Sequence, residues 1–222
     1  MFPSYTQAVT SFAAAERRRL CDLALEVGPD APTLSGSWTV RDLVAHLIVR
    51  EGHPASAGIM LPPLAQVLER AQDRVAAEDF EASVARLRKG PPLWSPFALP
   101  VLGALANIAE YAVHHEDVRR AQEPWEPRDL PRGEQDTLWR LVRTLGRGLG
   151  VQAPVGVLAE RSDAAGARAR VRRASGSRGD VTVRGTPLEL LLFLYGRQAH
   201  SVVDLDGDPA DVAALTGADL GI

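Results

Sequence analysis

The chain has 222 residues, of which 45% are hydrophobic and 24% are charged, and its formal net charge is −3. This composition is typical of a globular protein, with room for one large domain or for a medium domain followed by a small one. The small negative charge disfavours nucleic acid and anionic membranes as partners. No run of 18 apolar residues is present that would span a bilayer.

The setting expected from the sequence is cytoplasmic. The N-terminal stretch MFPSYTQAVTSFAAAERRRL lacks the charged start and apolar core of a signal peptide. The single cysteine, Cys21, has no intrachain disulfide partner, which fits a reducing compartment. Lys89 is the only lysine among 25 Lys and Arg residues, and the arginines are scattered through every segment, as in proteins from GC-rich genomes.

The first 150 residues predict helices separated by loops rich in Gly and Pro. Apolar residues recur at helical spacing over 4–26, where Ser4 is expected to cap the helix. Thr39 followed by Asp42 is a second capping pattern, and it begins a helix that runs to about Gly52. Further helices are expected over 62–77, 79–89, 101–121 and 131–148.

The character of the sequence changes after Gly150. The short, Val-containing runs PVGVLAE, ARARVRR and DVTVRG predict strands, and the arginines of the second run are expected on a solvated strand face rather than in an anion-binding patch. The apolar segment LELLLFLYGR and residues 209–215 predict helices. The sequence therefore predicts an α+β protein, with a helical domain over 1–150 and a small α+β domain over 151–222.

Candidate metal ligands lie on the helix expected at 101–121. Glu110 and His114 are four residues apart, so they differ by about 40° around the helix axis and share one face. A carboxylate and an imidazole at this spacing can bind one ion from a single rigid element. Asn107 and Asp117 lie on the same face and make it polar.

A third ligand has to come from another helix, because zinc takes three or four protein ligands. His46 is the best candidate, since it lies in the middle of the predicted helix that begins at Thr39, and facing helices supply the metal ligands of known bundles. Two histidines and one carboxylate suit Zn2+, and also Fe2+ or Ni2+. The alternative is that His46 is a hydrogen-bonded histidine of the core. His115 points about 100° away from His114 and is expected beside the site or at the surface.

These segments resemble a known family. GSWTVRDLVAHLIVRE followed by ANIAEYAVHHEDVRRA resembles the DinB-like metal-binding superfamily, and more narrowly the mycothiol-dependent maleylpyruvate isomerase group with its actinobacterial relatives. The segment VRGTPLELLLFLYGRQAHSVVDLDGDP resembles the small C-terminal α+β domain of the same group. Residues 55–100 and 122–175 match only loosely.

The resemblance implies a DinB-like four-helix bundle with a zinc ion held by two histidines and one glutamate, which here fall on His46, Glu110 and His114. Many bundle relatives carry a third histidine where this chain has Glu110, so the isomerase-like branch fits better. The group also implies a functional arginine on the second domain, and the matching position is Arg197. The alternative role of Arg197 is to satisfy carbonyls at the end of a helix.

The expected function is that of a zinc-binding protein that acts as a transferase or isomerase with mycothiol or another low-molecular-weight thiol. The metal would hold the thiol as a thiolate, and Arg197 would bind a carboxylate of a small electrophilic substrate. Two alternatives stay open, namely metal-dependent hydrolysis of small thiol conjugates and a non-catalytic metal-binding role. The sequence is compatible with a monomer or a homodimer.

Overall fold

The computed structural model describes residues 5–53, 62–99 and 102–221, and it divides into two compact units, Met1–Trp125 and Glu126–Ile222. The division lies about 25 residues before the domain boundary expected at 150. The reason is helix α6 (Arg132–Leu149), which was expected in the helical domain but packs against helix α7 (Pro187–Leu194) and strand β2 (Arg168–Arg172) of the second unit.

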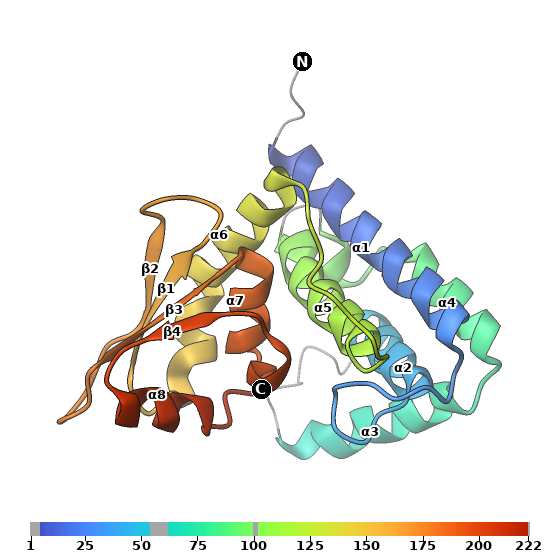
Figure 1. Ribbon diagram of the computed structural model, residues 1–222. Helices are drawn as coiled ribbons and strands as arrows, with labels where there is room; N and C mark the ends of the chain where they lie inside the picture. Colours follow the sequence, from blue (N-terminus) through green and yellow to red (C-terminus); the bar gives the residue numbers. More distant parts are fainter. Residues whose placement is uncertain (1–4, 54–61, 100–101, 222) are drawn as a thin grey trace. The chain divides into compact units, whose positions relative to one another are not determined.

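The described part of the first unit is helical (Figure 1). Its elements are α1 (Tyr5–Val27), α2 (Val40–Gly52), α3 (Pro62–Ala76), α4 (Phe80–Lys89), the short 3-10 helix η2 (Pro96–Ala98) and α5 (Leu102–Arg119). All five predicted α-helices of this unit are present, with ends within two residues of those expected. Ser4, the expected cap of the first helix, lies outside the described residues.

Local capping explains where two of these helices begin. Thr39 and Asp42 form the predicted capping box of α2, with the Asp42 carboxylate accepting the Thr39 N–H at 2.9 Å. Asp79 caps α4 by accepting the Ala82 N–H at 2.8 Å, and Gly90 ends that helix with a φ of 88°, which favours glycine. These contacts fix the ends of two helices that enclose the core of the unit.

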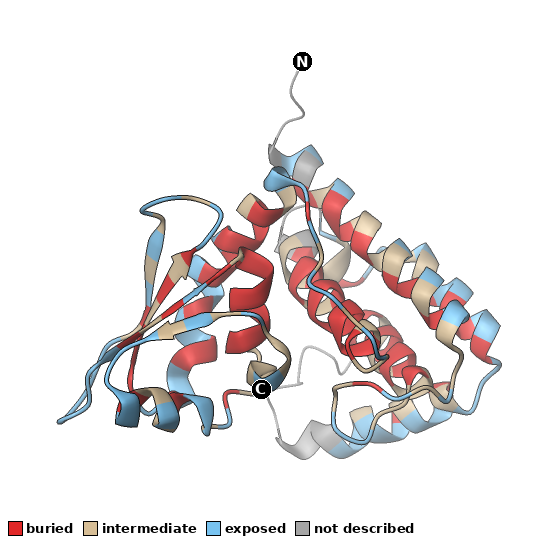
Figure 2. Cartoon of the chain, in the orientation of Figure 1, coloured by how far each residue is buried: buried red, intermediate tan, exposed pale blue. Residues whose placement is uncertain are grey.

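Helix α5 contributes buried residues on nearly every side (Figure 2). It packs against α1 and η2, while α2 packs against α3 and α4. Apolar residues of α5 such as Ile108, Val113 and Val118 are buried. Because α5 is buried on nearly every side, most of its polar residues must find partners inside the protein.

The second unit contains a four-stranded sheet with the order β2-β1-β3-β4. Strands β1 (Gly156–Arg161) and β3 (Asp180–Gly185) are parallel, and the outer strands pair antiparallel to them. The strand β4 (Asp204–Asp206) was not predicted, because the three residues Asp-Leu-Asp carry no hydrophobic alternation and lie at the edge of the sheet. The remaining elements are α8 (Pro209–Thr216) and the 3-10 helices η3 (Gly150–Gln152) and η4 (Gln198–His200).

Apolar strand residues of this unit face helices, and its strand arginines pair with acids. All eight residues of α7 are buried, as are Val157 of β1 and Val183 of β3. Arg168 and Arg184 both pair with Glu160, at 2.6 and 3.7 Å. Both arginine side chains are more than half exposed, as on a solvated strand face. No helix in the described part of the chain is long and apolar enough to cross a membrane.

Candidate metal centre

The three predicted ligands converge on one point of the first unit. His46 is carried by α2, and Glu110 and His114 are carried by α5. One ligand atom from each residue lies within 4.8 Å of the other two. The rings of His46 and His114 meet edge to face with their centres 5.5 Å apart, and His114 Nε2 lies 3.6 Å from Glu110 Oε2.

These spacings fit a zinc ion. Zinc binds imidazole nitrogen and carboxylate oxygen at about 2.0–2.2 Å, so two ligands of a tetrahedral site lie about 3.3–3.6 Å apart. The Glu110–His114 edge already has this length. His46 supplies the third atom of the cluster, within 4.8 Å of the other two.

The cluster is open on one side. His46 and Glu110 are of intermediate burial, and the Glu110 side chain keeps 23% of its surface exposed, while His114 is buried. Among the described His, Cys, Asp and Glu residues, only these three come together in this way. A tetrahedral ion held here would therefore keep a coordination position for a small ligand, as catalytic zinc sites do.

The three side chains have strongly shifted pKa values. Burial and the neighbouring His114 lower the pKa of His46 to about 4, so its imidazole is neutral at pH 7. Burial acts to raise the pKa of Glu110, but the hydrogen bond to His114 and the charge of Arg50 outweigh it and lower the value to about 2. Burial acts to lower the pKa of His114, but Asp117 and Glu110 raise it to about 9.

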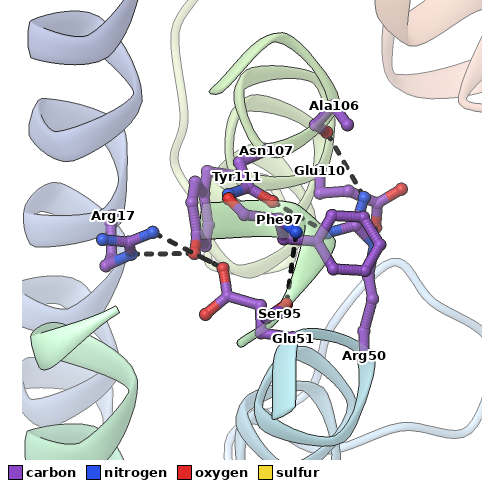
Figure 3. Close-up of polar contacts among 9 residues, drawn as sticks. All are labelled: Arg17, Arg50, Glu51, Ser95, Phe97, Ala106, Asn107, Glu110 and Tyr111. Atoms are coloured by element: carbon purple, nitrogen blue, oxygen red, sulfur yellow. Dashed lines mark hydrogen bonds and ion pairs between the residues drawn. The ribbon is translucent and has the colours of Figure 1, made fainter. Parts of the chain in front are cut away.

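Arg50 of α2 contacts the carboxylate of Glu110 (Figure 3), at the same oxygen that faces His114. Its Nε lies 3.4 Å from Glu110 Oε2, and its Nη1 donates to Asn107 Oδ1 at 3.0 Å. Its guanidinium stacks on the Phe97 ring at 4.2 Å from the ring centre. Asn107 in turn donates to the Phe97 carbonyl at 3.2 Å. The Glu110 carboxylate is thus held by a partly buried network from α2, η2 and α5.

A second buried network in Figure 3 joins α1, α2 and α5. The Tyr111 hydroxyl accepts a hydrogen bond from Arg17 Nε at 2.8 Å and donates one to the Glu51 carboxylate. Burial raises the pKa of Tyr111, and burial also raises that of Glu51. This network ties the helix that carries His46 to the helix that carries Glu110 and His114.

Two residues that serve the cluster were not assigned a role from the sequence. Asp117 Oδ2 lies 2.9 Å from His114 Nδ1, and Arg50 contacts Glu110 as described. The sequence spacing could have indicated both residues. Asp117 follows His114 by three residues on the same helix face, and Arg50 follows His46 by four. His115 is buried and pairs with Glu16 of α1 at 3.3 Å, so it lies beside the cluster and outside it.

Arg197 belongs to the second unit, whereas the three candidate ligands belong to the first. Its Nη1 donates to the Tyr195 carbonyl at 2.6 Å, just after the end of α7. This contact agrees with the alternative role, an arginine that satisfies carbonyls at a helix C-terminus. Binding of a substrate by Arg197 stays a prediction.

Comparisons with known proteins support the fold. No family model matches the sequence, and no curated protein sequence matches it. Two solved structures match over 92% of this chain and 93% of theirs, each at 15% sequence identity. They are the mycothiol-dependent maleylpyruvate isomerase, with a TM-score of 0.57, and a histidine-to-alanine mutant of that enzyme, with a TM-score of 0.58. The chain therefore has the α+β fold of the mycothiol-dependent maleylpyruvate isomerase, as the resemblance of its motifs implied.

Proposed function

We propose that this chain binds one divalent metal ion, zinc, through His46, Glu110 and His114, on a DinB-like four-helix bundle. The observation that carries the proposal is the convergence of two imidazoles and one carboxylate from two helices within 4.8 Å. Two histidines and one carboxylate form a known catalytic zinc ligand set. The neutral His46 and the ionised Glu110 are in the protonation states that metal binding requires.

We further propose that the protein is a transferase or isomerase that uses mycothiol or another low-molecular-weight thiol. The support is the shared fold with a mycothiol-dependent isomerase together with the open side of the cluster. A bound zinc ion lowers the pKa of a thiol and so supplies the nucleophilic thiolate. Arg50 and His114 hold the Glu110 carboxylate, and three protein ligands leave one position of a tetrahedral ion for the thiol.

Metal analysis of the purified protein tests the first proposal. We expect about one zinc per chain in the wild type and a loss of stoichiometric metal in His46→Ala and in His114→Ala. His200→Ala, which removes a half-buried histidine of the second unit, is the control and is expected to keep its metal. Wild-type protein that binds no divalent metal, or alanine variants that keep it, would refute the proposal.

A screen of mycothiol with small electrophiles tests the second proposal. We expect turnover that requires both the thiol and the metal, and that stops after complete chelation. Turnover without thiol would instead assign the protein to the metal-dependent hydrolases. Thiol-dependent turnover that survives complete chelation would exclude the proposed role of the metal.

A further inference from the structure

Asp117 is a carboxylate that is fully buried beside the metal cluster. Its Oδ2 lies 2.9 Å from His114 Nδ1 and accepts the hydroxyl of Ser35 at 2.8 Å. A buried carboxylate is costly unless charge-assisted hydrogen bonds compensate for its lost hydration. These contacts contribute to that compensation, and both end on the same oxygen atom.

The contact between Asp117 and His114 determines which ring nitrogen faces the cluster. A carboxylate only accepts hydrogen bonds, so His114 Nδ1 must carry the proton and donate it. The second nitrogen, Nε2, is then left for a ligand, and this is the atom that lies 3.6 Å from Glu110 Oε2. Asp117 therefore fixes both the tautomer and the orientation of the ring that a metal requires.

The loop between α1 and α2 contacts both the side chain and the backbone of Asp117. The backbone N–H of Leu34 donates to the Asp117 carbonyl at 3.0 Å, next to the contact from Ser35. The same loop reaches the second histidine, because the Trp38 ring lies 4.8 Å from the ring of His46. Thr33 braces the loop by donating its hydroxyl to the Trp38 carbonyl at 2.8 Å. One loop thus contacts the support of His114 and the ring of His46.

We propose that Asp117 is a positioning residue of the metal centre, and that the loop carrying Ser35 and Trp38 sets the affinity for metal by holding Asp117 and His46 in place. This inference rests on the proposed metal-binding function. It assigns a role to a part of the chain that supplies no ligand. Partners of this kind typically change metal affinity by roughly 10- to 100-fold when they are removed.

The test compares three variants by zinc competition with a chromogenic chelator. In Asp117→Asn, which keeps the shape and removes the charge, we expect affinity to fall roughly 10- to 100-fold. In Ser35→Ala, which removes the hydroxyl contact to Oδ2, we expect a loss of about 3- to 10-fold. The control is Glu16→Gln. Glu16 of α1 is an equally buried carboxylate, and it pairs with His115, the neighbour of His114 on α5. We expect the zinc affinity of this variant to be unchanged.

A second measurement reports on the geometry of the site independently of stability. With Co2+ in place of zinc, we expect the visible absorption bands of Asp117→Asn to shift from those of the wild type, and those of Glu16→Gln to coincide with them. The proposal is overturned if Asp117→Asn keeps wild-type affinity and spectrum, or if Glu16→Gln loses as much affinity as Asp117→Asn. If Asp117→Asn does not fold, Ser35→Ala decides, and wild-type affinity in that variant overturns the proposal.

The same assay separates this inference from the proposed function. His46→Ala is run beside the other variants. If it loses zinc while Asp117→Asn and Ser35→Ala do not, the metal site stands and the positioning role fails. If His46→Ala binds zinc as tightly as the wild type, the metal site itself is wrong and the inference fails with it.

Discussion

At the scale of single residues, the three candidate ligands differ in how ready they are to bind a metal at neutral pH. His46 is neutral because burial lowers its pKa to about 4, and Glu110 is ionised because its pKa is lowered to about 2. His114 has a raised pKa of about 9, so at pH 7 it carries a proton that a metal has to displace. One of the three ligands therefore makes metal binding dependent on pH.

We expect zinc affinity to rise by about tenfold per pH unit between pH 6.5 and 8.5, because each zinc ion releases one proton from His114. The stability of the metal-free protein should change in the opposite direction. A raised pKa in the folded state gives stability that is fully present below pH 6.5 and is lost as the pH rises through 9.

Chelator competition at pH 6.5, 7.5 and 8.5, with thermal unfolding of the chelated protein at the same values, measures both effects. Zinc affinity that stays constant across this range would show that His114 is already deprotonated and that Asp117 and Glu110 do not hold a proton on it.

At the scale of secondary-structure elements, the position of η2 against α5 is set by a glycine. Gly103, the second residue of α5, has no side chain, and a Cβ atom there would lie 2.3 Å from the Phe97 carbonyl oxygen. This close approach brings the Phe97 ring under the guanidinium of Arg50, which in turn contacts Glu110. The packing of one short helix is thus connected to a candidate ligand.

Gly103→Ala and Gly133→Ala form a matched pair that tests this packing. Both residues are second in an 18-residue helix, but a Cβ atom at Gly133 meets nothing within 4 Å. We expect Gly133→Ala to stabilise the protein by about 0.5 kcal/mol, because alanine restricts the unfolded chain. We expect Gly103→Ala to destabilise it by about 1–3 kcal/mol, because backbone atoms have to move. Thermal or urea unfolding measures both, and equal stabilisation by the two substitutions would contradict the proposed contact.

The elements that could be predicted from the sequence are those determined by local contacts. The capping box of Thr39 and Asp42 and the four-residue spacing of Glu110 and His114 each depend on neighbours along the chain, and both are present in the structure. Contacts between distant segments carry no such signal. The hydrogen bond from Ser35 to Asp117 spans 82 residues, and β4 exists only because β3 supplies a pairing edge.

At the scale of the whole molecule, the chain has two compact units with separate cores. Helix α6 accounts for the difference between this division and the boundary expected at 150. Its amphipathic pattern predicts a helix but does not identify the partner of its apolar face, and that partner is the sheet unit, where Gln135 also accepts the Leu188 N–H at 3.2 Å. All three candidate metal ligands belong to the first unit.

This division predicts where a bound metal stabilises the chain. A ligand that binds only the folded state slows local opening of the segments that hold it. We therefore expect zinc to slow amide hydrogen exchange in α2 and α5, and in the loop that contacts Asp117 through Ser35. Exchange in β1 and β3, whose hydrogen bonds lie within the sheet of the second unit, should stay the same. Hydrogen exchange followed by mass spectrometry, with His46→Ala as the control that shows no zinc effect, measures this difference. If zinc protected the amides of both units equally in the wild type, the two units would open as one cooperative body. If zinc protected only the second unit, the metal would bind outside the first unit.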